Sequence, residues 1–151
     1  MNICKAQEID LEEILKLQYL AYQSEAKLLN NYSIQPLTQT LEDLIKEYKN
    51  GVIYKAIIDQ QIIGSVRGYV QEGTLYIGKL IVHPDFQGKG IGTKLLEYIE
   101  NDHKSLRKEL FTSDKSIRNI RLYERCGYTP FKTKPVSDDL NMIYLEKDAA
   151  K

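Results

Sequence analysis

The stretch HPDFQGKGIGTKLLEYIE, residues 83–100, places three glycines within five residues directly before an amphipathic helix pattern. Glycine lets a ligand approach the backbone closely, and the free amides at a helix N-terminus attract anions. Lys89 and Thr93 add a cation and a hydroxyl donor, and no carboxylate lies between Gln87 and Lys94 to repel a phosphate. These residues predict an anion site. A glycine turn that only joins a strand to a helix is the alternative.

Two familiar phosphate-binding motifs do not match this stretch. A P-loop has its second glycine five residues after the first, but the residue five after Gly88 is Thr93. The dinucleotide fingerprint needs a further glycine three residues after Gly90, and that position is again Thr93. The remaining prediction is a phosphate site at the start of a helix, of neither of these two kinds.

A second pair of polar residues lies in SIRNIRLYERC, residues 116–126. On a helical wheel three arginines share one side, which is most simply solvated, whereas Asn119 and Tyr123 fall on the other side. An amide and a phenol in the interior need hydrogen-bond partners, so this pair is a candidate site. A buried structural tyrosine beside a bridging asparagine is the alternative.

The elements that would position these residues alternate along the chain. We expect strands over 1–7, 52–58, 62–70, 74–82, 109–112, 128–134 and 141–146, and helices over 10–29, 40–50, after the glycines, and over 116–126. Capping-box patterns, Asp10 with Glu13 and Thr40 with Asp43, mark the first two helix starts. The predicted fold class is α/β (α+β): a mixed, mostly antiparallel seven-stranded sheet flanked by about four helices. The strands on either side of the glycine-rich helix are expected to be parallel.

Length and composition limit the classes of function. The 151 residues, 42% of them hydrophobic, fit a single domain, residues 1–151. Basic and acidic residues number 21 each, so the net charge does not favour nucleic acid or membrane partners. The chain has no bilayer-spanning apolar run and no signal-peptide core, so we expect a cytoplasmic protein. The distant Cys4 and Cys126 and the two histidines have no metal-ligand spacing, which predicts unpaired thiols and no metal.

Two motifs carry a resemblance to a known family. LIVHPDFQGKGIGTKLLEYIE closely resembles motif A of the GNAT superfamily of N-acetyltransferases, whose core is Gln or Arg, two residues, Gly, one residue, then Gly or Ala. That core is Gln87, Gly90 and Gly92 here. NIRLYERCGYTPF, residues 119–131, resembles motif B, in which an Asn, a Tyr four residues later and a Gly followed by an aromatic residue recur. The resemblance implies a GNAT-like acyl-CoA N-acyltransferase fold.

The resemblance also implies acetyl-CoA as co-substrate. In that family the strand before the glycine turn lends backbone groups to the pantetheine arm, and the turn wraps the pyrophosphate. Carried over, the implied acetyl-CoA residues are Leu80, Ile81, Val82, Gln87, Gly88, Lys89, Gly90, Ile91, Gly92 and Thr93. Asn119 is implied to bond the pantetheine arm, and Tyr123 to lie beside the CoA sulfur.

An N-acetyltransferase would move the acetyl group to a primary amine by direct attack through a tetrahedral intermediate. A phenol with an ordinary pKa of about 10 is protonated at neutral pH, so Tyr123 is the predicted general acid. Backbone donors at the end of GKLIV are the predicted oxyanion donors if that strand is splayed from ELFT, and Gly78 is predicted to mark a bulge there.

The general base is less directly indicated. Many family members supply a carboxylate or histidine from the strand before motif A, but here that strand contains Lys79 and no acid. Glu72, at the turn before the strand, is the first candidate. Glu25, Tyr76 and a chain of waters are the alternatives.

The acceptor is predicted to be a small-molecule or peptide amine, with Tyr22, Glu25 and Tyr76 as its contacts. Glu25 with Asp138 and Asp139 favours a cationic acceptor. A homodimer is a further expectation by family habit. The competing classes are a module that binds acyl-CoA without reacting it, and an interaction protein with an incidental glycine turn.

Overall fold

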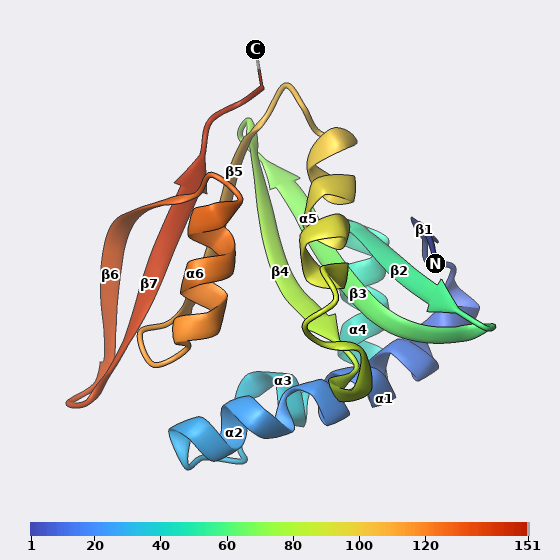
Figure 1. The fold of residues 1–151 in the computed structure, drawn as a ribbon, viewed down its shortest axis with the longest axis horizontal. Helices are drawn as coiled ribbons and strands as arrows, with labels where there is room; N and C mark the ends of the chain where they lie inside the picture. The colour runs from blue at the N-terminus through green and yellow to red at the C-terminus, as the bar shows by residue number, and fades with distance from the viewer. Residues whose placement is uncertain (151) are drawn as a thin grey trace.

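The order of elements follows the sequence prediction. The computed structural model describes residues 1–150 and is shown in Figure 1. The strands are β1 Asn2–Lys5, β2 Val52–Ile58, β3 Gln61–Gln71, β4 Thr74–Val82, β5 Arg107–Ser113, β6 Thr129–Ser137 and β7 Leu140–Lys147. The helices are α1 Leu11–Ala21, α2 Gln23–Leu29, α3 Gln35–Thr38, α4 Leu41–Asn50, α5 Ile91–Asn101 and α6 Ile117–Arg125, with short 3-10 helices η1 Glu8–Asp10 and η2 Pro84–Phe86.

The helical region between β1 and β2 is more divided than predicted. The expected helix over 10–29 is two helices, because the backbone at Tyr22 (φ −85°, ψ 0°) ends α1 and begins α2. The predicted loop after it contains the short α3. The described residues therefore contain six α-helices rather than about four.

The first predicted helix start is confirmed in position, because Asp10 is the N-cap of α1, but its predicted capping box does not form. The second start is confirmed together with its capping box. Asp10 accepts a hydrogen bond from the Gln7 amide at 2.8 Å, so the capping box opens η1 three residues earlier than expected. Glu13 instead accepts from the Ile62 amide at 2.9 Å and ties α1 to β3. At α4, the Thr40 hydroxyl accepts from the Asp43 amide at 3.1 Å, as the pattern predicts.

The sheet has the predicted seven strands and mixed direction. Its order is β1-β2-β3-β4-β5-β7-β6, and every neighbouring pair is antiparallel except β4 and β5. These two parallel strands pair over only three positions, from Thr74 with Arg107 to Tyr76 with Glu109. Beyond Tyr76, β4 stays paired with β3, and β5 stays paired with β7. The two halves of the sheet are therefore splayed apart (Figure 1).

A bulge lies in β4 where it leaves β5. The register with β3 shifts so that Arg67 pairs with Gly78 whereas Ser65 pairs with Ile81. The predicted bulge at Gly78 is thus confirmed, and the left-handed residue is its neighbour Lys79 (φ +49°). A bulge reverses the alternation of side chains along a strand. Ile77 packs in the core on one face of the sheet, and Ile81 packs in the core on the other.

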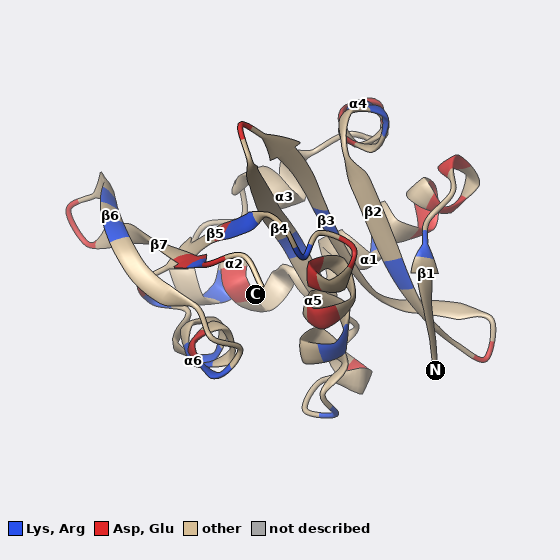
Figure 2. Cartoon of the chain, turned by 90° about the horizontal axis from the view of Figure 1, so that it is seen from above, with Lys and Arg blue, Asp and Glu red and all other residues tan. Residues whose placement is uncertain are grey.

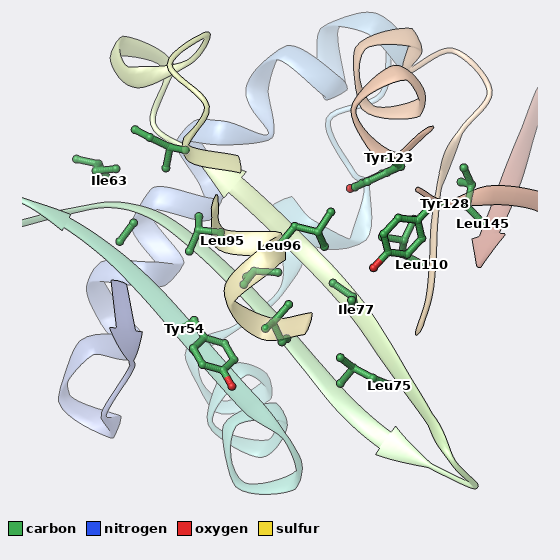
Figure 3. Packing of buried hydrophobic residues seen from close by; sticks show 14 residues of the cluster. Tyr54, Ile63, Leu75, Ile77, Leu95, Leu96, Leu110, Tyr123, Tyr128 and Leu145 are labelled. Atoms are coloured by element: carbon green, nitrogen blue, oxygen red, sulfur yellow. The ribbon is translucent and has the colours of Figure 1, made fainter. Parts of the chain in front are cut away.

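Two hydrophobic cores cover the two faces of the sheet. One is formed mainly with α5 and α6 and includes Leu95, Leu96 and Tyr123 (Figure 3). The other is formed with α1 and α4 and includes Leu11, Ile14 and Leu44. The splayed strands lie between these layers, so the sheet edge at the splay is reachable from both faces.

Two further sequence predictions concern disulfide bonds and membrane-spanning helices. Cys4 and Cys126 are both free thiols, which confirms that they are unpaired. No helix in residues 1–150 combines the length and the apolar character that crossing a bilayer requires.

Candidate active site

A cleft opens where β4 and β5 separate. Its volume is about 1680 Å³, larger than the roughly 300–1,000 Å³ of a typical small-ligand pocket, so it has room for a long ligand together with a second molecule. Most of the predicted site residues line it: Tyr22, Glu25, Tyr76, Leu80, Ile81, Val82, Gln87, Gly88, Gly90, Ile91, Gly92, Thr93, Asn119 and Tyr123. The structure thus brings together residues from α2, β4, α5 and α6, from the junction of α1 and α2, and from the glycine turn.

The glycine turn presents bare backbone to the cleft. Gly88 (φ +76°) and Gly90 (φ +79°) have left-handed conformations that other residues rarely adopt. A Cβ atom added at either glycine would meet no heavy atom of the protein within 4 Å. Gly90 is the N-cap of α5 without a side-chain cap, and no acidic residue lies in the first turn. The turn therefore has the open space and free amides that fit a phosphate group.

Gln87 holds this turn against its neighbours. Its amide nitrogen donates to the Val82 carbonyl at 3.3 Å, and its side-chain oxygen accepts from Arg118 at 3.5 Å. The turn is thereby joined to the end of β4 and to the start of α6. Lys89 does not line the cleft. It is exposed, and its ammonium lies 5.4 Å from the centroid of the Phe86 ring.

The backbone of β4 is free on one side beside the turn. In residues 1–150, no strand pairs with the β5-facing edge of β4 after Tyr76. Leu80 and Val82 pack their side chains against the α5 core, whereas Ile81 packs against the α1 core. A ligand that lies along this edge could form sheet-like hydrogen bonds with the unpaired amide and carbonyl groups.

Tyr123 projects from α6 beneath the cleft. Its side chain is 7% exposed, and Figure 3 shows its hydroxyl directed away from Tyr128. No hydrogen-bond partner of this hydroxyl occurs among residues 1–150. Burial raises the pKa of the Tyr123 phenol well above its usual range, and Tyr22, Cys126 and Glu25 add to the effect. The phenol therefore keeps its proton at neutral pH.

Asn119 is exposed rather than interior, because it lies in the first turn of α6 at the mouth of the cleft. Its amide donates to the Thr112 hydroxyl on β5 at 3.4 Å. The expectation that Asn119 and Tyr123 both face the interior holds only for Tyr123.

Four acidic side chains line the cleft, and three of them are neutralised. The ion pairs are Glu47 with Arg67 at 2.6 Å, Glu109 with Arg107 at 2.9 Å and Asp139 with Lys115 at 3.5 Å. Glu25 has no basic side chain within 4 Å in residues 1–150. It accepts hydrogen bonds from the hydroxyls of Ser113, at 3.2 Å, and of Ser116. Glu25 on α2 therefore faces β5 and α6 across the cleft with its charge uncompensated.

Glu72 lies apart from these residues. It occupies the turn between β3 and β4, is exposed, and does not line the cleft. The splay that forms the cleft lies after Tyr76, whereas Glu72 precedes the paired end of β4. The structure does not bring Glu72 together with Tyr123.

The two tyrosines predicted to contact the acceptor both line the cleft. Burial raises the pKa of Tyr22 to about 12, partly offset by Arg67. Tyr76 stacks on Tyr69, with ring centroids 5.2 Å apart. The stacked rings of Tyr69 and Tyr76 form an aromatic wall on the face of the sheet opposite α5.

Sequence reasoning missed several residues of the cleft. Arg67 and Lys79 lie side by side in the sheet at the β4 bulge, and Ser113 and Ser116 hold Glu25. One signal was available, because an arginine in the apolar run IIGSVRGYV is unusual for a central strand. The two serines carried no such signal.

Several known proteins resemble this chain. Residues 11–128 match the model of the acetyltransferase (GNAT) family. S-(2-succino)cysteine N-acetyltransferase of Bacillus subtilis is 28% identical over 94% of this chain and 92% of its own length. The UPF0157 protein YqkA of Bacillus subtilis is 26% identical over 85% of this chain, which spans only 37% of that longer protein.

A solved structure has the same fold. YncA of Salmonella typhimurium, solved with its cofactor acetyl-CoA, superposes with a TM-score of 0.79 at 18% identity, covering 100% of this chain and 95% of YncA. The GNAT-like fold predicted from the two motifs is confirmed. The family model covers both the glycine turn and most of motif B, and this chain belongs to the acetyltransferase (GNAT) family.

Proposed function

We propose that this protein is an acetyl-CoA-dependent N-acetyltransferase that acts on a primary amine. The observation that carries the proposal is the cleft itself. It joins a bare glycine turn and an unpaired strand edge to a protonated phenol and an unneutralised carboxylate. Membership of the acetyltransferase family and a fold shared with an acetyl-CoA-bound structure support it.

The glycine turn and β4 are proposed to hold the donor. Amides of residues 88–93 would bind the pyrophosphate, and the free edge of β4 from Leu80 to Val82 would bind the pantetheine arm. Acetyl-CoA supplies the acetyl group as a thioester. Asn119 at the mouth of the cleft would contact the arm, and Gln87 would hold the turn in place.

Tyr123 is proposed as the general acid and Glu25 as the general base. A raised pKa keeps the phenol protonated, so it can give a proton to the departing thiolate. Glu25 is the cleft carboxylate that no cation neutralises, and two serine hydroxyls orient it. It would remove the proton from the attacking amine directly or through water. This assignment replaces Glu72, which lies outside the cleft.

The acceptor is proposed to be a small molecule rather than a protein. One relative of similar length is named for acetylation of S-(2-succino)cysteine, which is a small amine. The test is an assay of CoA release over a panel of amines, together with calorimetric titration of acetyl-CoA. The enzyme predicts CoA release that depends on an acceptor. Saturable acetyl-CoA binding without turnover of any amine would instead support the non-catalytic binding module.

A further inference from the structure

We infer that the acceptor is an amino acid, or a similar small molecule with a carboxylate beside its amine, and that Lys79 and Arg67 bind the carboxylate. The inference rests on the proposed function and names the substrate class for that site. Three observations support it: an unpaired cation, an arginine with an unused donor, and the arrangement of opposite charges along the cleft.

Lys79 is the unpaired cation. It lines the cleft at the β4 bulge, is partly buried, and has no acidic side chain within 4 Å in residues 1–150. Lys46, Arg118 and Arg125 also line the cleft without an acidic partner, but all three are exposed. Burial lowers the pKa of Lys79, the nearby Arg67 lowers it further, and Glu47 partly offsets both effects. A desolvated ammonium without a counterion is unfavourable, and an anionic ligand would remove that cost.

Arg67 is the second cation. It is 6% exposed on β3 and pairs across the sheet with Gly78, next to Lys79. Its two terminal nitrogens donate to side chains of α1, α4 and the residue after α3, which are Gln18, Glu47 and Gln39. Its Nε is buried and has no hydrogen-bond partner. Glu47 balances one of the two positive charges, so the pair keeps a net charge of about +1.

Opposite charges line one cleft, with Glu25 on α2 and with Arg67 and Lys79 beside the β4 bulge. Tyr22 lies within electrostatic range of both, because Arg67 lowers its pKa and Glu25 raises it. Tyr123 is likewise within range of Tyr22 and Glu25. Figure 2 shows basic residues on β3 and β4 and an acidic residue on α2. A molecule with an ammonium and a carboxylate matches these opposite charges, with its amine at Glu25 and its carboxylate at Lys79.

The same charges argue against the cationic acceptor that the sequence favoured. Of the three acidic residues behind that expectation, Asp139 pairs with Lys115 at 3.5 Å, and Asp138 does not line the cleft. Only Glu25 stays available, and the same cleft is also lined by Lys79 and Arg67. A polyamine would bring a second positive charge toward Lys79 and Arg67.

The test measures binding and turnover with one set of ligands. The probes are the common L-amino acids and their C-terminal amides, titrated by calorimetry into the protein loaded with CoA and assayed for CoA release with acetyl-CoA. The amide keeps the amine and removes the negative charge. At least one acid should bind about tenfold or more tightly than its amide, which corresponds to about 1.4 kcal/mol.

Variants assign this preference to Lys79. Lys79→Met should abolish the preference for acid over amide while leaving the KM for acetyl-CoA within about twofold. Lys79→Arg should keep it, and so should Lys115→Met, which removes a cleft lysine that is already ion-paired. Thermal melts show whether each variant is folded. If Lys79→Met does not fold, Lys79→Gln is used instead.

Two outcomes overturn the inference: amides that bind as well as acids, including the case in which neither binds, or a preference that survives loss of the Lys79 charge. Selective binding of acids without any CoA release would support the carboxylate site and would contradict the proposed acetyltransferase activity.

Discussion

The two sides of the cleft present different kinds of chemical groups. The glycine turn and the edge of β4 present backbone groups, and a Cβ atom at Gly88 or Gly90 would project into open space. The opposite side presents side chains, including Glu25 from α2, Arg67 from β3 and Lys79 from β4. The first side is contiguous in sequence, whereas the second is assembled from distant segments.

This difference suggests how specificity can vary within one fold. A backbone site depends on a few conformations, which a short motif can encode. A side-chain site depends on which residues face the cleft, and each can be replaced without changing the fold. The donor should therefore be shared with relatives, and the acceptor should be particular to this chain. Tyr123 on α6 lines the same cleft.

Loss of the Tyr123 hydroxyl should have the largest effect. Tyr123→Phe should lower kcat by about 100-fold or more, because general acid catalysis contributes about 10²–10⁴-fold. KM for acetyl-CoA should change little. Tyr98→Phe, on the exposed side of α5, is the control and should keep full activity. Equal activity of Tyr123→Phe and the wild type would remove Tyr123 from the mechanism.

The next largest effect on kcat is expected for Glu25, with Glu72 as its comparison. Glu25→Gln should lower kcat by roughly 10–100-fold, because the amide cannot accept the proton of the amine. Its carbonyl can still accept from Ser113 and Ser116, so the melting temperature should change little. Glu72→Gln should have kinetics like those of the wild type. The reverse pattern would return the base to Glu72 and contradict the present assignment.

The backbone side can be tested with two matched glycines. Gly90 (φ +79°) and Gly73 (φ +81°) have the same left-handed conformation, and a Cβ atom at either would meet no atom within 4 Å. Alanine at either position should cost about 1 kcal/mol of stability. Only Gly90→Ala should also raise KM for acetyl-CoA, by about tenfold, because its methyl group enters the proposed phosphate space. Equal KM values for the two variants would argue against that space.

The smallest effect concerns Tyr22 at alkaline pH. Its folded pKa is about 12, and an unfolded tyrosine has a pKa of about 10. Between these values the unfolded chain has lost the proton and the folded chain has kept it, so stability should fall as pH rises. Below about pH 10 this contribution is constant. Urea unfolding across this window should show a shallower decline for Tyr22→Phe than for the exposed control Tyr69→Phe.

The contrast between a contiguous backbone site and a side-chain site assembled from distant segments also explains which features the sequence could predict. The order of elements along the chain, the parallel pair and the glycine turn follow from periodicity and from Gly88 and Gly90, which are local signals. The break of the first helix at Tyr22 has no glycine or proline to announce it. It nevertheless brings Glu25 to the cleft.

The acceptor side was less predictable because it depends on tertiary contacts. Glu72 was favoured because it lies near β4 in sequence, but the turn that holds it is at the far end of the strand. The bulge at Lys79 reverses which side chains face each core, and strand alternation alone could not show this. Arg67 and Glu25 line the same cleft although they lie 42 residues apart, which only the tertiary packing of the chain could show.

The central claim is that donor and acceptor occupy one cleft together and that the acetyl group passes directly between them. Initial rates of CoA release, measured while acetyl-CoA and an amine acceptor are both varied, test it most directly. Direct transfer predicts double-reciprocal lines that intersect, because both substrates must be bound at once. Parallel lines, which indicate a covalent acetyl-enzyme, would contradict the account.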